Sequence, residues 1–226
     1  MKKIKKPSFL AIIPARGNSK RIKNKNIKIF NGKPLIYWTI VAALKSNFID
    51  EVYVSSDDKS ILKISNQYSA KTIIRPKNLS GPIIHGDIAM KHAYLKIKKK
   101  FDYIVMLQPT CPLRTSVNID KAAKIILKKK YDSLLSVNFD TSFLWKKERY
   151  FYNSINYNFK QRPRKQDVQF YKENGAIYIT KPKILIKKNN RLGGKIGVYN
   201  MGDEVSIDID TLSDFKIAEH FFKNKW

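Results

Sequence analysis

The chain has 226 residues, of which 43% are hydrophobic and 12% aromatic, a composition that is typical of a folded globular protein and excludes a disordered one. A single cysteine excludes an internal disulfide and a cysteine-based zinc cluster. The net charge of +27 raises the question of a nucleic-acid or membrane partner.

The basic residues are scattered along the chain, mostly at the ends of the expected elements and interleaved with isoleucine and tyrosine. We therefore interpret the charge as a compositional bias that also steers anionic substrates toward the protein. No apolar run is long enough to span a bilayer, and too few apolar residues follow the lysine-rich start for a signal peptide. We expect a cytoplasmic protein with neither a nucleic-acid partner nor membrane insertion.

Hydrophobic periodicity predicts alternating strands and helices along most of the chain. Strands are expected at residues 9–13, 51–56, 71–74, 103–107, 132–137, 171–180 and 195–199. Helices are expected at residues 35–44, 57–68, 86–97, 117–127 and 212–222. This alternation predicts an α/β fold with a Rossmann-like, doubly wound, mostly parallel sheet, and the length predicts one domain over residues 1–226.

The alternation stops at residues 139–170, which carry many aromatic side chains among charges and show no helical period. Monomeric proteins rarely expose this much apolar surface. We expect an inserted segment that either contacts a second copy of the chain or caps the site as a flap.

A cationic loop follows the first expected strand, from Pro14 to Asn26. A loop at the end of a parallel strand lies at the carboxyl edge of the sheet, where open α/β folds bind ligands. Its backbone amides and its lysine and arginine side chains suit a triphosphate. The spacing fits neither GxxxxGK[ST] nor GxGxxG, so the sequence predicts a phosphate loop of another kind.

Asp208 and Asp210 alternate with isoleucines near the end of the chain. In an extended segment this alternation puts both carboxylates on one face. Two close carboxylates suit magnesium, but a solvated strand end followed by a helix cap fits the same spacing. Spacing alone leaves both interpretations open.

Four motifs in order resemble those of the acylneuraminate cytidylyltransferase (CMP-N-acetylneuraminic acid synthetase) family. They are IPARGNSKRIKNKNI at 13–27, LQPTCPLR at 107–114, ENGAIY at 173–178 and SIDIDT at 206–211. The resemblance implies a fold of the nucleotide-diphospho-sugar transferase type. It also implies a homodimer that forms through the inserted segment.

The resemblance further implies an enzyme that transfers CMP from CTP to the anomeric hydroxyl of a nonulosonic (sialic-type) acid, with Mg²⁺ as cofactor. We expect N-acetylneuraminate as the nine-carbon sugar acid. Lys25-Asn26 favours this branch over the Kdo enzymes, whereas Arg21 replaces a glycine common in neuraminate enzymes. Legionaminate, pseudaminate and Kdo therefore stay as alternatives. A non-catalytic nucleic-acid-binding protein is a remote one, because it would not explain four ordered motifs.

The family motifs also assign roles to particular residues. The residues implied as catalytic are Arg16, Lys25 and Asp210, and those implied as magnesium ligands are Asp208 and Asp210. The residues implied in nucleotide binding are Ala15, Arg16, Gly17, Asn18, Ser19, Lys25, Asn26 and Arg75. The residues implied in binding the sugar acid are Gln108, Arg164, Glu173 and Asn174.

Three further residues of these motifs carry weaker expectations. Cys111 stands where the family usually has serine, and we expect it to be a small structural residue. Tyr178 is expected in the core. Arg114 fits a phosphate contact and a structural ion pair equally well.

Overall fold

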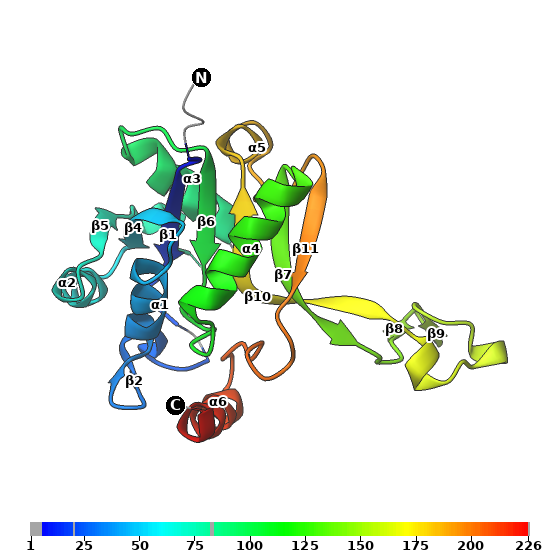
Figure 1. Cartoon of the computed structure of the whole chain (residues 1–226). Helices are drawn as coiled ribbons and strands as arrows, with labels where there is room; N and C mark the ends of the chain where they lie inside the picture. Colours follow the sequence, from blue (N-terminus) through cyan, green and yellow to red (C-terminus); the bar gives the residue numbers. More distant parts are fainter. Residues whose placement is uncertain (1–5, 20, 82–83, 226) are drawn as a thin grey trace.

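A seven-stranded sheet with the order β11-β7-β10-β6-β1-β4-β5 forms the centre of the protein (Figure 1). The computed structural model describes residues 6–19, 21–81 and 84–225. The strands of this sheet are β1 (Phe9–Pro14), β4 (Ile49–Ser56), β5 (Lys71–Ile74), β6 (Tyr103–Leu107), β7 (Ser133–Asp140), β10 (Phe170–Thr180) and β11 (Ile196–Asn200). The α-helices are α1 (Leu35–Leu44), α2 (Lys59–Gln67), α3 (Gly86–Lys96), α4 (Ser116–Lys129), α5 (Pro182–Lys188) and α6 (Leu212–Lys225).

All neighbouring strands pair in parallel except β10, which is antiparallel to both β6 and β7. The central strand β1 is buried on both faces because its side chains alternate between two cores. Phe9, Ala11 and Ile13 join the core under α1 and α4. Leu10 and Ile12 join the core under α3 and α5. The predicted doubly wound, mostly parallel α/β fold is confirmed.

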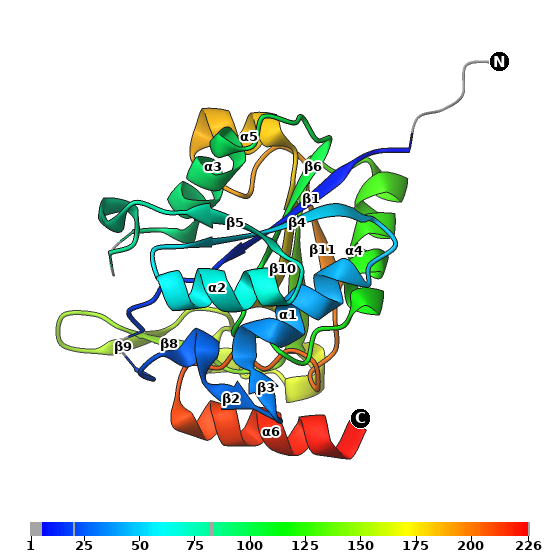
Figure 2. The same ribbon diagram turned by 90° about the vertical axis from the view of Figure 1, so that its left-hand side faces the viewer.

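A third apolar cluster fixes the C-terminal helix α6 against the segment that follows the cationic loop (Figure 2). Phe30 lies in the small hairpin formed by β2 (Ile29–Phe30) and β3 (Lys33–Pro34). Its ring centroid is 5.4 Å from that of Phe215 and 5.5 Å from that of Phe222. Trp38 of α1 packs on Phe222 at 4.4 Å and donates a hydrogen bond from Nε1 to the Phe30 carbonyl oxygen. The β2–β3 hairpin, α1 and the C-terminal helix α6 are therefore packed together beside the sheet.

The inserted segment 139–170 forms an arm that projects from β7 and β10, away from the sheet (Figure 1). It contains a hairpin of β8 (Trp145–Lys147) and β9 (Tyr152–Ser154) and two short 3-10 turns, η3 (Phe159–Gln161) and η4 (Lys165–Asp167). The Arg162 guanidinium lies 4.4 Å from the centroid of the Phe143 ring. Large aromatic side chains along the arm remain exposed, with Tyr150 at 87%.

The short elements were not predicted from the sequence. The seven-residue helix α5, which Pro182 begins, has too few residues to show a helical period. The β2–β3 and β8–β9 hairpins have strands of only two or three residues. Helix α2 begins at Lys59 rather than at Asp57, because the Asp58 carboxylate caps it by accepting from the amides of Ser60 and Ile61. Among the described residues, no helix has the length and apolar character needed to cross a membrane.

Glu51 at the start of β4 carries a pH-dependent contribution to stability. It accepts hydrogen bonds from Lys71 Nζ at 2.8 Å and Lys99 Nζ at 2.7 Å. These ammonium groups, Lys71 first, lower the pKa of Glu51 from 4.5 to about 2. A carboxyl group with a lowered folded pKa stabilises the fold above its unfolded pKa and loses that effect as the pH falls.

Glu51→Gln should therefore lower the free energy of unfolding at pH 7 by about 1 kcal/mol, allowing for solvent screening of the two exposed lysines. The difference from the unchanged protein should shrink between about pH 4.5 and pH 2, as measured by urea unfolding at several pH values. Glu148→Gln, in an exposed pair with Lys146 at 3.5 Å, is the matched control and should cost less than half as much. A Glu51→Gln difference that persists unchanged at the lowest pH would contradict this account.

Candidate active site

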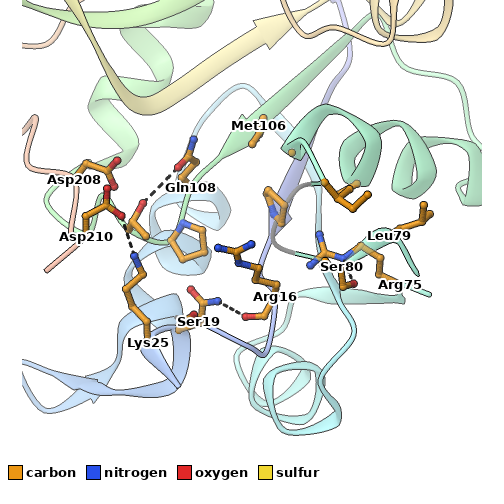
Figure 3. A pocket seen from close by; sticks show the side chains of 18 of the residues that line it. Arg16, Ser19, Lys25, Arg75, Leu79, Ser80, Met106, Gln108, Asp208 and Asp210 are labelled. Carbon is orange, nitrogen blue, oxygen red and sulfur yellow. Dashed lines mark hydrogen bonds and ion pairs between the residues drawn. The ribbon is translucent and has the colours of Figure 1, made fainter. Parts of the chain in front are cut away.

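A cavity of about 540 Å³ lies at the carboxyl edge of the sheet, where the ends of β1 and β6 meet the segment before α6 (Figure 3). Its lining combines cationic side chains, two carboxylates and two side-chain amides. The lining residues are Pro14, Arg16, Ser19, Arg21, Lys25, Asn26, Arg75, Leu79, Ser80, Gly81, Ile84, Gly86, Ala89, Met106, Gln108, Pro109, Thr110, Arg191, Asp208 and Asp210. The structure thus brings the cationic loop and the two distant aspartates together, as the sequence predicts.

Lys25 connects these two parts of the site directly. Its Nζ donates to the carbonyl oxygen of Ile209 at 2.6 Å and lies 3.4 Å from Asp210 Oδ1 (Figure 3). Arg21 Nη1 lies 2.8 Å from Asp210 Oδ2. The Lys25 side chain is 12% exposed and that of Arg21 is 64% exposed, so Lys25 is the inner cation and Arg21 is at the mouth of the cavity.

Asp208 lies deeper than Asp210, against the turn that follows β6. Burial raises the pKa of Asp208; the Thr110 hydroxyl opposes this shift and the Asp210 carboxylate adds to it. Ile209, between the two aspartates, is fully buried in the α6 cluster, and its amide donates to the Thr110 carbonyl oxygen at 2.8 Å. The alternation predicted for this segment is therefore observed, with both carboxylates facing the cavity and Ile209 facing the core.

Two amides at the start of the cationic loop are bonded within the protein, so these two are not free to cradle phosphates. Ala15 N–H donates to the Ser55 carbonyl oxygen at 3.0 Å, and Gly17 N–H donates to Asp57 Oδ1 at 3.1 Å. A Cβ at Gly17 would lie only 2.7 Å from the Cβ of Asp58, so a glycine is needed for this close approach.

Several residues of the loop line the cavity. Arg16 and Ser19 line it, and the buried Asn26 fixes the loop by donating from Nδ2 to the Arg16 carbonyl oxygen at 2.9 Å. Asn18 is exposed and does not line the cavity. Lys20, a further candidate cation of the loop, lies outside the described residues.

Arg75 follows β5 and forms another wall of the cavity. It is 5% exposed, its Nη2 lies 3.6 Å from Asp57 Oδ1, and its Nε donates to Ser80 Oγ at 2.9 Å (Figure 3). Burial lowers the pKa of Arg75, and the Asp57 carboxylate acts against this shift. Arg75 is thus a preorganised cation at the side of the cavity away from the two aspartates (Figure 3).

Gln108 lies at the end of β6 and lines the cavity, as expected from its position. Opposite it, β10 contains an irregularity between Glu173 and Tyr178, where its register with β7 shifts. Gly175 within it has φ +74°, and a Cβ there would lie 3.5 Å from Asp208 Oδ2 and 3.6 Å from Gln108 Nε2. Bulges of this kind often occur next to active sites, because they redirect the backbone.

Arg114 lies behind the cavity wall and fixes the backbone of Gln108 and of the irregularity in β10. The sequence did not predict this role. Its guanidinium is fully buried, and its Nη1 donates to the carbonyl oxygens of Gln108 at 3.2 Å and Ala176 at 3.0 Å. Burial lowers the pKa of Arg114 to about 10. Arg114 pairs with no carboxylate in the described part of the chain and does not line the cavity, so it forms neither of the two contacts expected for it.

Cys111 is fully buried, and burial raises the pKa of its thiol to about 12. Its Sγ lies 3.5 Å from the Asn174 carbonyl oxygen. Because a nucleophile must be available as thiolate, this cysteine is a structural residue, as expected.

The remaining residues predicted to bind the sugar acid do not line the cavity of their own chain. Asn174 is buried, and its side chain bonds to the hydroxyls of Ser136 and Ser206 at 2.6 and 2.9 Å. Glu173 is exposed and accepts a hydrogen bond from the hydroxyl of Tyr178, whose ring lies in the core as predicted.

Arg164 lies in the arm, where its Nε is paired with Asp167 Oδ2 at 3.0 Å. No residue of the arm lines the cavity of the same chain. In this structure the arm therefore does not cover the cavity of its own chain.

The arrangement suits a phosphate-bearing ligand. Cations lie on two sides of the cavity, and two carboxylates at one end offer the hard oxygen ligands that magnesium prefers. Within the described residues no group of three or more acidic, histidine or cysteine side chains is placed to hold a metal ion by itself. Two carboxylates fit a magnesium ion whose other ligands are phosphate oxygens and water.

Comparison with known proteins identifies relatives over nearly the whole chain. A family model described as cytidylyltransferase matches residues 10–225. The chain is 35% identical over 223 residues to N-acylneuraminate cytidylyltransferase A of Danio rerio. The matched region covers 96% of this chain and 51% of that protein. It is 32% identical to the pseudaminic acid cytidylyltransferase of Campylobacter jejuni, over 95% of this chain and 96% of that one. The chain thus spans about half the length of the Danio rerio relative.

A solved structure of CMP:2-keto-3-deoxy-manno-octonic acid synthetase in complex with CTP has the same fold. It superposes with a TM-score of 0.76 over 97% of this chain and 100% of that chain. The sequence identity is 15%, so this similarity concerns the fold alone.

Gly175→Ala tests the geometry of the corner between Asp208 and Gln108. A side chain at φ +74° is strained, so unfolding should be easier by about 1–2 kcal/mol, and the methyl group would fill the gap between the two side chains. Gly32→Ala is the matched control, because Gly32 has φ +77° and nothing within 4 Å of the added Cβ.

Both variants should lose similar stability in denaturant unfolding, but only Gly175→Ala should weaken the binding of CTP with magnesium in titration calorimetry. Equal binding losses in the two variants would show that backbone strain alone, and not the filled gap, affects the cavity.

Proposed function

The chain belongs to the cytidylyltransferase family, and on this premise we propose that it transfers CMP from CTP to the anomeric hydroxyl of a nonulosonic acid and releases pyrophosphate. The observation that carries the proposal is the convergence of Arg16 and Lys25 with Asp208 and Asp210 on one cavity. The anomeric oxygen attacks the α-phosphorus of CTP, and the bond to the β-phosphate oxygen breaks. The acceptor's hydroxyl proton is lost to solvent, since no general base is evident at the cavity.

Catalysis in this proposal consists of positioning and charge neutralisation. Arg16 and Lys25 bind the triphosphate, Arg75 with Ser80 holds the cytidine end, and Gln108 binds the sugar acid. Asp208 and Asp210 would hold a magnesium ion, which when bound neutralises charge on the phosphate oxygens. Lys25 and Arg21 are both close to Asp210. When the nucleotide binds, each gives up part of its interaction with Asp210 and contacts phosphate oxygens instead.

We propose N-acetylneuraminate as the acceptor. Support comes from the sialic-type motif and from the Danio rerio relative, which is named for N-acylneuraminate. A second candidate is pseudaminate, favoured by Arg21 and by the Campylobacter jejuni relative, which is named for that acid and matches over almost its full length. The supply of CTP makes the cytoplasm the proposed location.

We propose that two chains form a homodimer through the arm, because exposed aromatic side chains such as Trp145, Phe151 and Tyr152 need a partner surface. Arg164 lies in the arm and does not line the cavity of its own chain. If it binds the sugar acid, it does so in the cavity of the other chain. The active dimer then has two sites, each completed by both chains.

Asp210→Asn tests the enzymatic proposal. With CTP, magnesium and a panel of neuraminate, legionaminate, pseudaminate and Kdo, the unchanged protein should release pyrophosphate with at least one acid. Asp210→Asn should reduce kcat by at least about 100-fold, because it replaces a charged carboxylate ligand of the proposed magnesium ion with a neutral amide. Asp203→Asn changes a carboxylate of the same segment that does not line the cavity and should leave kcat within about twofold. The proposal fails if no acid of the panel is turned over.

Subunit complementation tests the shared site. Arg164→Ala and Asp210→Asn chains should each be nearly inactive alone, but mixing them after dissociation should restore about one quarter of the turnover. Half of the randomly paired dimers are mixed, and one of their two sites has both residues intact. Light scattering should show a dimer in every case. An absence of recovery in confirmed mixed dimers would place Arg164 outside the partner's site.

A further inference from the structure

Both carboxylate oxygens of Asp210 are engaged by cations of the protein itself. Arg21 Nη1 lies 2.8 Å from Oδ2, and Lys25 Nζ lies 3.4 Å from Oδ1. Asp208, the other proposed magnesium ligand, instead bonds to the uncharged hydroxyl of Thr110. Of the two carboxylates, it is therefore Asp210 whose availability to a metal ion depends on cations of the same chain.

The two cations beside Asp210 are held very differently. Lys25 Nζ also donates to the Ile209 carbonyl oxygen at 2.6 Å, and its side chain is 12% exposed, so the surrounding protein fixes it. The Arg21 side chain is 64% exposed, and within the described residues its ion pair with Asp210 is its one polar side-chain contact. Because exposed ion pairs contribute little to stability, Arg21 is free to leave Asp210 when another anion offers a better contact.

Arg21 and a divalent cation compete for the same carboxylate oxygen, since guanidinium groups and magnesium both bind carboxylate and phosphate oxygens. Asp208 and Asp210 are the acidic side chains among the described residues that line the cavity. Without a nucleotide, an Arg21 guanidinium displaced from Asp210 would exchange an ion pair for water. A triphosphate supplies several oxygens that suit the planar fork of arginine donors. The nucleotide therefore favours the release of Asp210 by Arg21.

We infer that Arg21 is a positioning residue that keeps Asp210 from binding a divalent cation until a nucleotide triphosphate draws its guanidinium away. The inference rests on the proposed function, and it assigns an order to the assembly of the site. The triphosphate enters first, and Asp210 becomes a metal ligand afterwards. Lys25 has a smaller share in this exchange, because the Ile209 carbonyl oxygen retains its ammonium group.

Arg21→Gln tests this inference through metal binding in the absence of nucleotide. The substitution removes the charge and keeps a polar side chain, so both the charge and the ion pair that cover Asp210 are lost. Mn²⁺, which prefers the same oxygen ligands as magnesium, is the probe, and its unbound fraction is measured by electron paramagnetic resonance. The variant should bind Mn²⁺ at least about threefold more tightly than the unchanged protein, because the competing cation is gone.

Lys23→Gln is the matched control. Lys23 is exposed in the same loop, does not line the cavity, and loses the same charge on substitution. It should change the affinity for Mn²⁺ by less than about twofold, because an exposed charge away from the cavity is screened by solvent. Circular dichroism should show that both variants are folded.

A double variant locates the gain in affinity. Asp210→Asn in the Arg21→Gln background should remove the gain, because the carboxylate that Arg21 had covered is then absent. When the proteins are saturated with CTP, the difference in Mn²⁺ affinity between Arg21→Gln and the unchanged protein should shrink. A gain of less than about threefold without nucleotide, a gain that survives Asp210→Asn, or a difference that CTP leaves unchanged would overturn the inference.

Metal binding also separates this inference from the proposed function, because it requires neither a sugar acid nor turnover. A gain in Mn²⁺ affinity that is confined to Arg21→Gln and depends on Asp210 would uphold the inference even if no acid of the panel released pyrophosphate. Pyrophosphate release by a protein whose Mn²⁺ affinity is indifferent to Arg21→Gln would leave the proposed function standing and remove the inference.

Discussion

The hydrogen bond from Lys25 Nζ to the carbonyl oxygen of Ile209 joins residues that are 184 positions apart in the sequence. The same Ile209 donates its amide to Thr110 and buries its side chain against α6. The carbonyl, the amide and the side chain of Ile209 are thus all held by contacts. These contacts restrict the orientation of the flanking residues Asp208 and Asp210. The position of both carboxylates depends on the packing of α6 against Phe30 and on the segment that carries Lys25.

A second constraint acts behind the cavity wall, where Arg114 joins the residue after β6 to the middle of β10. A buried guanidinium with only carbonyl partners is costly, and it persists because it satisfies the carbonyls of Gln108 and Ala176. Gly175 directly precedes Ala176 and faces Asp208 and Gln108. Arg114 thus fixes the backbone around this part of the cavity, although it does not line the cavity itself. Arg114 therefore supports the cavity without lining it, whereas Lys25 both lines the cavity and holds the segment of the two aspartates.

The sequence was sufficient for the elements with clear periodicity and for the convergence of their ends. Parallel strands present their carboxyl ends at one edge, so the loop after β1, Gln108 after β6 and the two aspartates had to approach one another. The sequence did not allow the side-chain directions within β10 to be predicted. The irregularity between Glu173 and Tyr178 changes which residues face the cavity, and no periodicity reveals such a shift. Arg191 was missed because a single arginine after two asparagines resembles any surface turn.

Strand β10 runs without interruption from the base of the arm at Phe170 to the core at Thr180, and it passes Gly175 on the way (Figure 1). It is also the one strand of the main sheet that runs against all its neighbours. The base of the exposed aromatic arm and the corner of the cavity beside Asp208 and Gln108 are therefore parts of one strand. A displacement of the arm would be transmitted along the backbone of β10 toward Gly175, so the position of the arm and the shape of the cavity are linked by one strand.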